Sequence, residues 1–238
     1  MSGHSHWKKV KYKKGATDAK KSKMFSKLSR MISVAAQEKG GDPSTNNKLK
    51  IAIDTAKSFN LPKDTIERAI KKGTGELEGT KLEEVLFEAY GPQKTALIIE
   101  GITDNKNRTF SDIKQVLFQY NGKLAETGSV QWLFDRKGVI TVNVTDQKKE
   151  DIELIAIEAG VDDIAWNDGE VDLYTKAEDL EKVRKNLEEK NLKIESSSLD
   201  WVAKQNIKVE NTESVEKLFE ALDEVDEVQE IYSNFKMP

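Results

Sequence analysis

The sequence predicts an α+β fold, in which an N-terminal three-helix domain is followed by two ferredoxin-like α/β domains, one inserted in the other. Three observations predict it: helical periodicity in a lysine-rich first third, a glycine-rich acidic segment after it, and alternating strand and helix patterns in the remainder. The 238 residues also exceed a typical single domain. The expected units are a basic helical domain at 1–75, a discontinuous α/β domain at 82–135 plus 207–238, and an inserted domain at 137–204.

Charge is divided unevenly along the chain. Residues 1–73 contain 18 Lys and Arg against 6 Asp and Glu, and residues 74–238 contain 20 against 36. The first part therefore carries a net charge of +12 and the second a net charge of -16, which together make the -4 of the whole chain. Such asymmetry favours a polyanionic partner for the basic part. The alternative is a lysine-rich surface that is merely solvated.

The first predicted helix lies within residues 20–41. Apolar residues recur at helical spacing along one side, and three cations repeat at the same spacing on the opposite side, so that one face can pack while the other stays charged. Gly40 and Gly41 end this helix. The apolar stripe contains Met24, Leu28, Met31, Ile32 and Ala35, and the cationic row contains Lys23, Lys27 and Arg30.

Two shorter helices complete the predicted bundle. Asp42 and Pro43 suit the N-cap and first turn of the second helix. Pro62 begins the third helix, which Gly73 ends. The inward residues are Leu49, Ala52, Ile53 and Ala56 in the second helix, and Ile66, Ala69 and Ile70 in the third.

Strand and helix patterns follow a glycine-rich, acidic linker at 73–81. Strands are expected at VLFEAY, TALIIEGI and SVQWLFD, with the helix RTFSDIKQVLFQYN before the last of them. The next elements, from GVITVNV to KIESSSLDWV, have the order β-α-β-β-α-β of a ferredoxin-like unit. The tail ESVEKLFEALDEV and VQEIYSNF adds a helix and a strand, which would complete a similar unit begun at residue 82.

The first 15 residues have no helix or strand period and are expected to form an extended arm. The stretch GHSHWKKVKYKKG places five lysines beside Trp7 and Tyr12. Lysines suit phosphates and aromatic rings can stack on bases, but the two rings could equally anchor the arm by packing. Together with cations of the first helix, the predicted nucleic-acid-binding residues are His4, Trp7, Lys8, Lys9, Lys11, Tyr12, Lys13, Lys14, Lys20, Lys23, Lys27 and Arg30.

A second anion site is predicted at the segment TDNKNRT. It lies between a strand and a helix start, where free backbone N–H groups would adjoin Lys106 and Arg108. The alternative is ordinary helix capping by Asp104, Asn105 or Asn107.

A series of motifs resembles the YebC family. Its members are described as probable transcriptional regulatory proteins and include mitochondrial translational activators of cytochrome c oxidase. The resemblance implies a helical N-terminal domain with two α/β domains, nucleic-acid binding through the helical domain, and a role in transcription, at the ribosome, or both. The motifs span nearly the whole chain in order: GHSHW, DAKKSKMFSKLSRMISVAA, GGDP, LPKDTIERAIKKG, EAYGP, TDNKNRT and GSVQWLF.

The resemblance also carries the family's basic N-terminal motif onto this chain. Three sites depart from the family pattern: His6 replaces a lysine, Gln93 and Lys94 replace glycines, and Lys106 replaces an arginine. A lysine keeps the charge of an arginine but not its bidentate fork. The motif falls on Gly3, His4, Ser5, Trp7, Lys8, Asp18, Ala19, Lys20, Lys23 and Phe25.

Catalysis is not expected. The chain has no cysteine, its two histidines are His4 and His6, and it lacks dinucleotide-binding and nucleophile-elbow motifs. Two histidines without a third ligand do not indicate a metal site. No cofactor and no small-molecule substrate are indicated, and the longest apolar runs are too short to cross a membrane.

The predicted function is a regulator of gene expression that binds DNA through its basic N-terminal domain. The alternative is a ribosome-associated translation factor that binds ribosomal RNA, and an RNA-modifying enzyme is less favoured. The expected partners are nucleic acid, whether DNA or ribosomal RNA, and the ribosome. The expected location is the cytoplasm.

Overall fold

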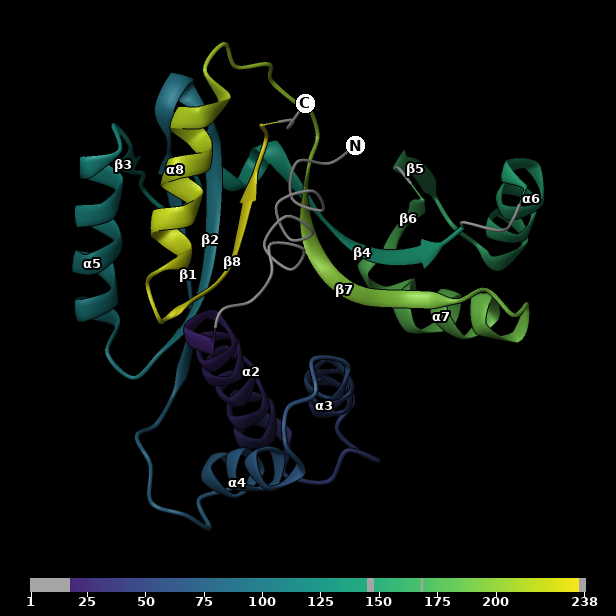
Figure 1. The fold of residues 1–238 in the computed structure, drawn as a ribbon, viewed down its shortest axis with the longest axis horizontal. Coiled ribbons are helices and arrows are strands. Elements are labelled where there is room, and N and C mark those ends of the chain that lie inside the picture. Colours follow the sequence, from purple (N-terminus) through teal and green to yellow (C-terminus); the bar gives the residue numbers. More distant parts are fainter. Residues whose placement is uncertain (1–17, 145–147, 168, 236–238) are drawn as a thin grey trace.

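The computed structural model describes residues 18–144, 148–167 and 169–235, with side chains from residue 21 onward (Figure 1). Its first unit is a bundle of three helices. Leu28 and Ile32 of the first helix pack against Leu49 and Ile66 of the other two. The helices are α2 (Asp18–Lys39), α3 (Asn47–Ser58) and α4 (Lys63–Gly73).

The turn between α2 and α3 differs from the sequence prediction at the helix start. Gly40 follows α2 with a φ of +88°, a left-handed conformation that favours glycine. The cap of α3 is Asn46 and not Asp42, because the buried Asn46 side chain accepts a hydrogen bond from the Leu49 N–H. Asp42 instead accepts a hydrogen bond from the Ser44 N–H, and this bond lowers the pKa of the Asp42 carboxyl.

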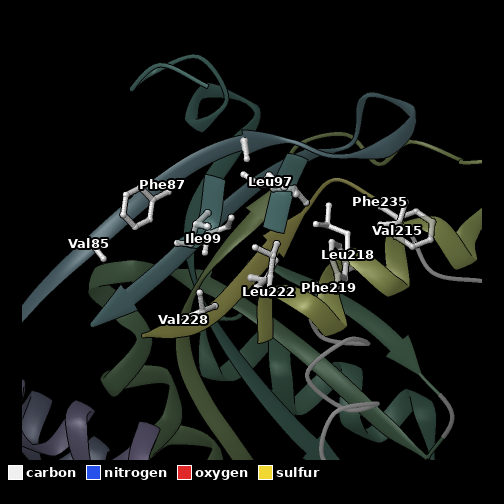
Figure 2. Packing of buried hydrophobic residues seen from close by; sticks show 14 residues of the cluster. Val85, Phe87, Leu97, Ile99, Val215, Leu218, Phe219, Leu222, Val228 and Phe235 are labelled. Atoms are coloured by element: carbon white, nitrogen blue, oxygen red, sulfur yellow. The ribbon is translucent and has the colours of Figure 1, made fainter. Parts of the chain in front are cut away.

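The second unit is a four-stranded antiparallel sheet with two helices on one face. The strand order is β3-β1-β2-β8. Alternate strand residues such as Leu97 and Ile99 face the helices, where Leu218 and Leu222 pack against them (Figure 2). The elements are β1 (Glu83–Tyr90), β2 (Ala96–Thr103), α5 (Lys106–Gln119), β3 (Lys123–Leu124), α8 (Thr212–Asp223) and β8 (Val228–Ser233).

The third unit is inserted between β3 and α8. Its strand order is β5-β6-β4-β7, and with two helices its connections are those of a ferredoxin-like unit. The first sheet lacks these connections, because its two central strands, β1 and β2, follow each other directly as a hairpin. The inserted elements are β4 (Phe134–Asn143), α6 (Lys149–Ala159), β5 (Asp163–Asn167), β6 (Glu170–Lys176), α7 (Leu180–Glu189) and β7 (Ile194–Ala203).

The segment SVQWLFD is not the strand that its sequence predicts. It forms a 3₁₀ turn at Gln131–Leu133 and enters β4 only at Phe134. The buried carboxylate of Glu88 draws backbone donors away from strand pairing. It accepts hydrogen bonds from the N–H groups of Gly128 and Val130, each at 2.5 Å, and of Gln131 at 2.8 Å.

The two sheets are joined by packing and by a polar contact. Ile98 and Tyr232, on the face of the first sheet opposite its helices, pack with Phe134 of β4. Burial raises the pKa of the Tyr232 hydroxyl well above its ordinary value, so the hydroxyl stays protonated. The carboxylate of Glu100 accepts hydrogen bonds from Arg136 Nη1 at 2.8 Å, Trp201 Nε1 at 2.8 Å and Tyr232 Oη at 3.1 Å.

Candidate nucleic-acid interface

The predicted cationic row of α2 lies against the turn between α8 and β8. The Lys27 ammonium donates to Asp223 Oδ1 at 2.7 Å and to the Asp223 carbonyl at 3.1 Å. Lys23 donates to Glu224 Oε2 at 3.0 Å. The helical bundle is thereby fastened to the α/β body through charge-assisted hydrogen bonds.

Burial distinguishes the members of this row. Lys27 is 4% exposed, whereas Lys23 and Arg30 are of intermediate exposure. Arg30 donates to the backbone carbonyl of Asp226, in the same turn. The expectation of an open cationic face on α2 is therefore wrong, because the far side of the helix meets a run of carboxylates and carbonyls instead of water.

The arm residues predicted to bind nucleic acid lie outside the described residues. Nucleic-acid binding by the arm therefore stays a prediction from the sequence. For Lys20 it describes the backbone, within α2, but not the side chain. The arm residues concerned are His4, Trp7, Lys8, Lys9, Lys11, Tyr12, Lys13 and Lys14.

The predicted second anion site is occupied in part by carboxylates of the chain itself. Arg108 Nη2 donates to Asp104 Oδ1 and to Glu227 Oε1, both at 2.8 Å. The hydrogen bond that Arg108 donates to Glu227, followed by the charges of Asp104 and Glu227, raises the pKa of Arg108. Asn105 caps α5 by accepting from the Arg108 N–H, as in the alternative interpretation. Lys106 is exposed at the first position of this helix.

The solvent-facing cations of the bundle lie mainly on α3 and α4. From residue 47 to 73 the chain has seven Lys and Arg against three Asp and Glu. All seven of these cations are exposed, and five of them take part in no ion pair within the described part of the chain. These five are Lys50, Lys57, Arg68, Lys71 and Lys72.

The sequence contained a signal for these five cations. Lys50 and Lys57 are seven residues apart along one flank of the apolar stripe of α3, and the three cations of α4 follow the i, i+3, i+4 pattern. This is the same kind of pattern that identified the row on α2. Periodicity alone could not tell which of the rows would be covered by another unit.

The described residues contain neither a metal-binding cluster nor a membrane-spanning helix. Among them, no group of three or more His, Asp or Glu side chains is arranged to hold a metal ion. Their helices are also too short or too polar to span a bilayer.

Comparisons with known proteins identify the family. The sequence model of the TACO1/YebC N-terminal domain matches residues 5–76, and that of the TACO1/YebC second and third domains matches residues 82–235. The chain belongs to the TACO1/YebC family. Its resemblance to YebC proteins, seen first in the motifs, is thereby confirmed.

Full-length relatives and a solved structure extend this match. A probable transcriptional regulatory protein of Caldanaerobacter subterraneus is 47% identical, over 100% of this chain and 99% of its own length. One from Halothermothrix orenii is 46% identical over 100% of this chain and 96% of its own. The crystal structure of a conserved hypothetical protein from Aquifex aeolicus superposes with a TM-score of 0.85 at 40% identity, covering 93% of this chain and 92% of that one.

Proposed function

We propose that this TACO1/YebC chain is a regulator of gene expression that binds DNA through its basic N-terminal unit, residues 1–75. The observation that carries the proposal is the set of exposed cations on α3 and α4 that form no ion pair with another described residue. Cations that neutralise phosphates release condensed counterions, and this release supplies most of the non-specific affinity for nucleic acid. The names of the full-length relatives, as probable transcriptional regulatory proteins, support the regulatory role.

The acidic body fits a supporting role in this proposal. Residues 74–238 carry a net charge of -16, which repels phosphates over roughly a Debye length, about 8 Å at physiological salt. A polyanion would therefore approach from the side of the helical bundle.

A second candidate is a translation factor that binds ribosomal RNA. Trp7 and Tyr12, interleaved with lysines in the arm sequence, favour it because stacking on unpaired bases contributes about 1–3 kcal/mol per base. Plain duplex DNA offers no unpaired bases. The ratio of affinities for a looped RNA and a DNA duplex separates the two candidates.

The proposal predicts that cations of α4 contribute to binding. Replacing Arg68, Lys71 and Lys72 by Gln in the full chain removes three phosphate contacts, which lowers the slope of log affinity against log salt by about 2.7 on duplex DNA. Fluorescence anisotropy of a labelled 30-base-pair duplex, titrated at four salt concentrations, measures this slope.

A matched variant controls for net charge. Lys114, Lys176 and Lys193 are exposed lysines of the α/β body, and their replacement by Gln changes the total charge by the same amount. The affinity of this control is expected to stay within about twofold of the unmodified chain, because its cations lie outside the bundle. Equal losses in both triple variants, or a wild-type chain that binds neither duplex DNA nor a labelled RNA hairpin, would overturn the proposal.

A further inference from the structure

We propose that a groove between α3 and α7 holds the phosphodiester backbone of a bound nucleic acid, so that the inserted unit supplies part of the binding site. This inference rests on the proposed function and adds a site to it. The groove has a volume of about 510 Å³. Its charged lining is Lys50, Asp54 and Lys57 of α3 together with Lys185 of α7.

The groove lies where two units of the chain meet. In Figure 1, α3 is on the side of the bundle nearest to α7. An electrostatic contact between Asp54 and Arg184 of α7 links the same two helices. Lys185 is therefore held beside the bundle although it belongs to the acidic part of the sequence.

The three lysines of the groove are available to a ligand. Lys50, Lys57 and Lys185 are all exposed, and within the described residues none of them is paired with a carboxylate. The single carboxylate of the lining, Asp54, also interacts electrostatically with Arg184. Three ammonium groups against one carboxylate leave a net positive groove, the charge that a phosphate chain requires.

Helix stability does not explain the position of Lys50. It lies in the first turns of α3, close to the end where the helix dipole disfavours cations, and the first turn contains no acidic residue. The positive end of the α3 dipole adds to the same potential. A cation at a position that costs stability is typical of a binding surface.

The groove is also open rather than pocket-like, and its lining offers ammonium groups without an aromatic platform. Lysine acts on phosphate as a mobile point charge, without reading bases. The geometry thus suits an extended backbone of either DNA or RNA, independent of sequence.

The decisive variant is Lys185→Gln in the full chain, because this residue lies outside the N-terminal domain. We expect it to weaken binding about fivefold at 0.15 M salt and to lower the salt slope by about 0.9 on duplex DNA, or about 0.7 on single-stranded RNA. Lys193→Gln, an exposed lysine of the same inserted unit outside the groove, is expected to bind like the wild type. A 30-base-pair DNA duplex and a 30-nucleotide single-stranded RNA serve as the two probes.

Removing a negative charge from the groove, instead of a positive one, provides an independent check. Asp54→Asn removes the negative charge of the groove and is expected to tighten binding severalfold to both probes. If the wild type binds but Lys185→Gln matches Lys193→Gln, or if Asp54→Asn does not strengthen binding, the groove is overturned while the proposed function stands. If the wild-type chain binds neither probe, the proposed function fails and the groove with it.

Discussion

The two cationic faces of the helical bundle differ in what they meet. On α2, Lys23 and Lys27 contact carboxylates of the α8–β8 turn, and Lys27 is nearly inaccessible to water. On α3 and α4, cations such as Lys50 and Lys71 extend into solvent. The same residue type at the same helical spacing therefore fastens one unit to another in the first case and remains available to a ligand in the second.

The turn between α8 and β8 is an acidic surface within the same chain, and it occupies the cations of α2 as a polyanion would. Asp223, Glu224 and Asp226 place three carboxylates within four positions at the end of α8. Carbonyl groups of this turn accept further hydrogen bonds from α2. The turn thus pairs with the cations of α2 much as phosphates would, and it leaves the cations of α3 and α4 exposed.

The largest expected effect on stability comes from the most buried cation. Lys27→Ala removes the ammonium group that pairs with the Asp223 carboxylate, and the Asp223 side chain is only 20% exposed. Breaking such a pair leaves a poorly solvated charge, and we expect a loss of about 3 kcal/mol in the free energy of unfolding. Urea denaturation followed by circular dichroism measures it.

The matched control for this prediction is Lys57→Ala on α3. Because Lys57 is exposed and unpaired within the described residues, its loss should change stability by no more than about 0.5 kcal/mol. Equal urea midpoints for the two variants would remove the distinction between the faces.

A smaller effect is expected for the outer pair of the same contact. Glu224 is 70% exposed at its side chain, so its pair with Lys23 is screened by solvent. A double-mutant cycle with Lys23→Gln and Glu224→Gln should give a coupling energy of about 0.5 kcal/mol that falls as salt is added. A coupling as large as the Lys27 effect would mean that the whole row is buried in solution.

Sequence patterns predicted the elements more reliably than their contacts. The apolar stripe from Met24 to Ala35 set the inward face of α2, and strand and helix order identified the inserted ferredoxin-like unit, because both depend on local periodicity. The α2 cations were misplaced for a different reason. Their partners lie about 200 positions away in the sequence, at a distance that no local pattern reports.

Lys185 illustrates the same limit for the candidate site. It stands in a charged helix of the acidic part, LEKVRKNLEEK, where nothing local distinguishes it from its neighbours. Only the approach of α7 to α3 brings it beside Lys50 and Lys57. The strand predicted at SVQWLFD was wrong for the same reason. The carboxylate of Glu88, about 40 positions away, accepts hydrogen bonds from backbone N–H groups of this segment.

Lysine acetylation of the full chain, read by mass spectrometry with and without a saturating DNA duplex, compares the two faces most directly. We predict that Lys50, Lys57 and Lys71 react readily in the free protein and are protected by DNA, because they are exposed until phosphates cover them. Lys27 should react slowly in both states, because it is already enclosed by the α8–β8 turn. Rapid labelling of Lys27 in the free protein, with protection by DNA at Lys27 but not at Lys50, would contradict the account.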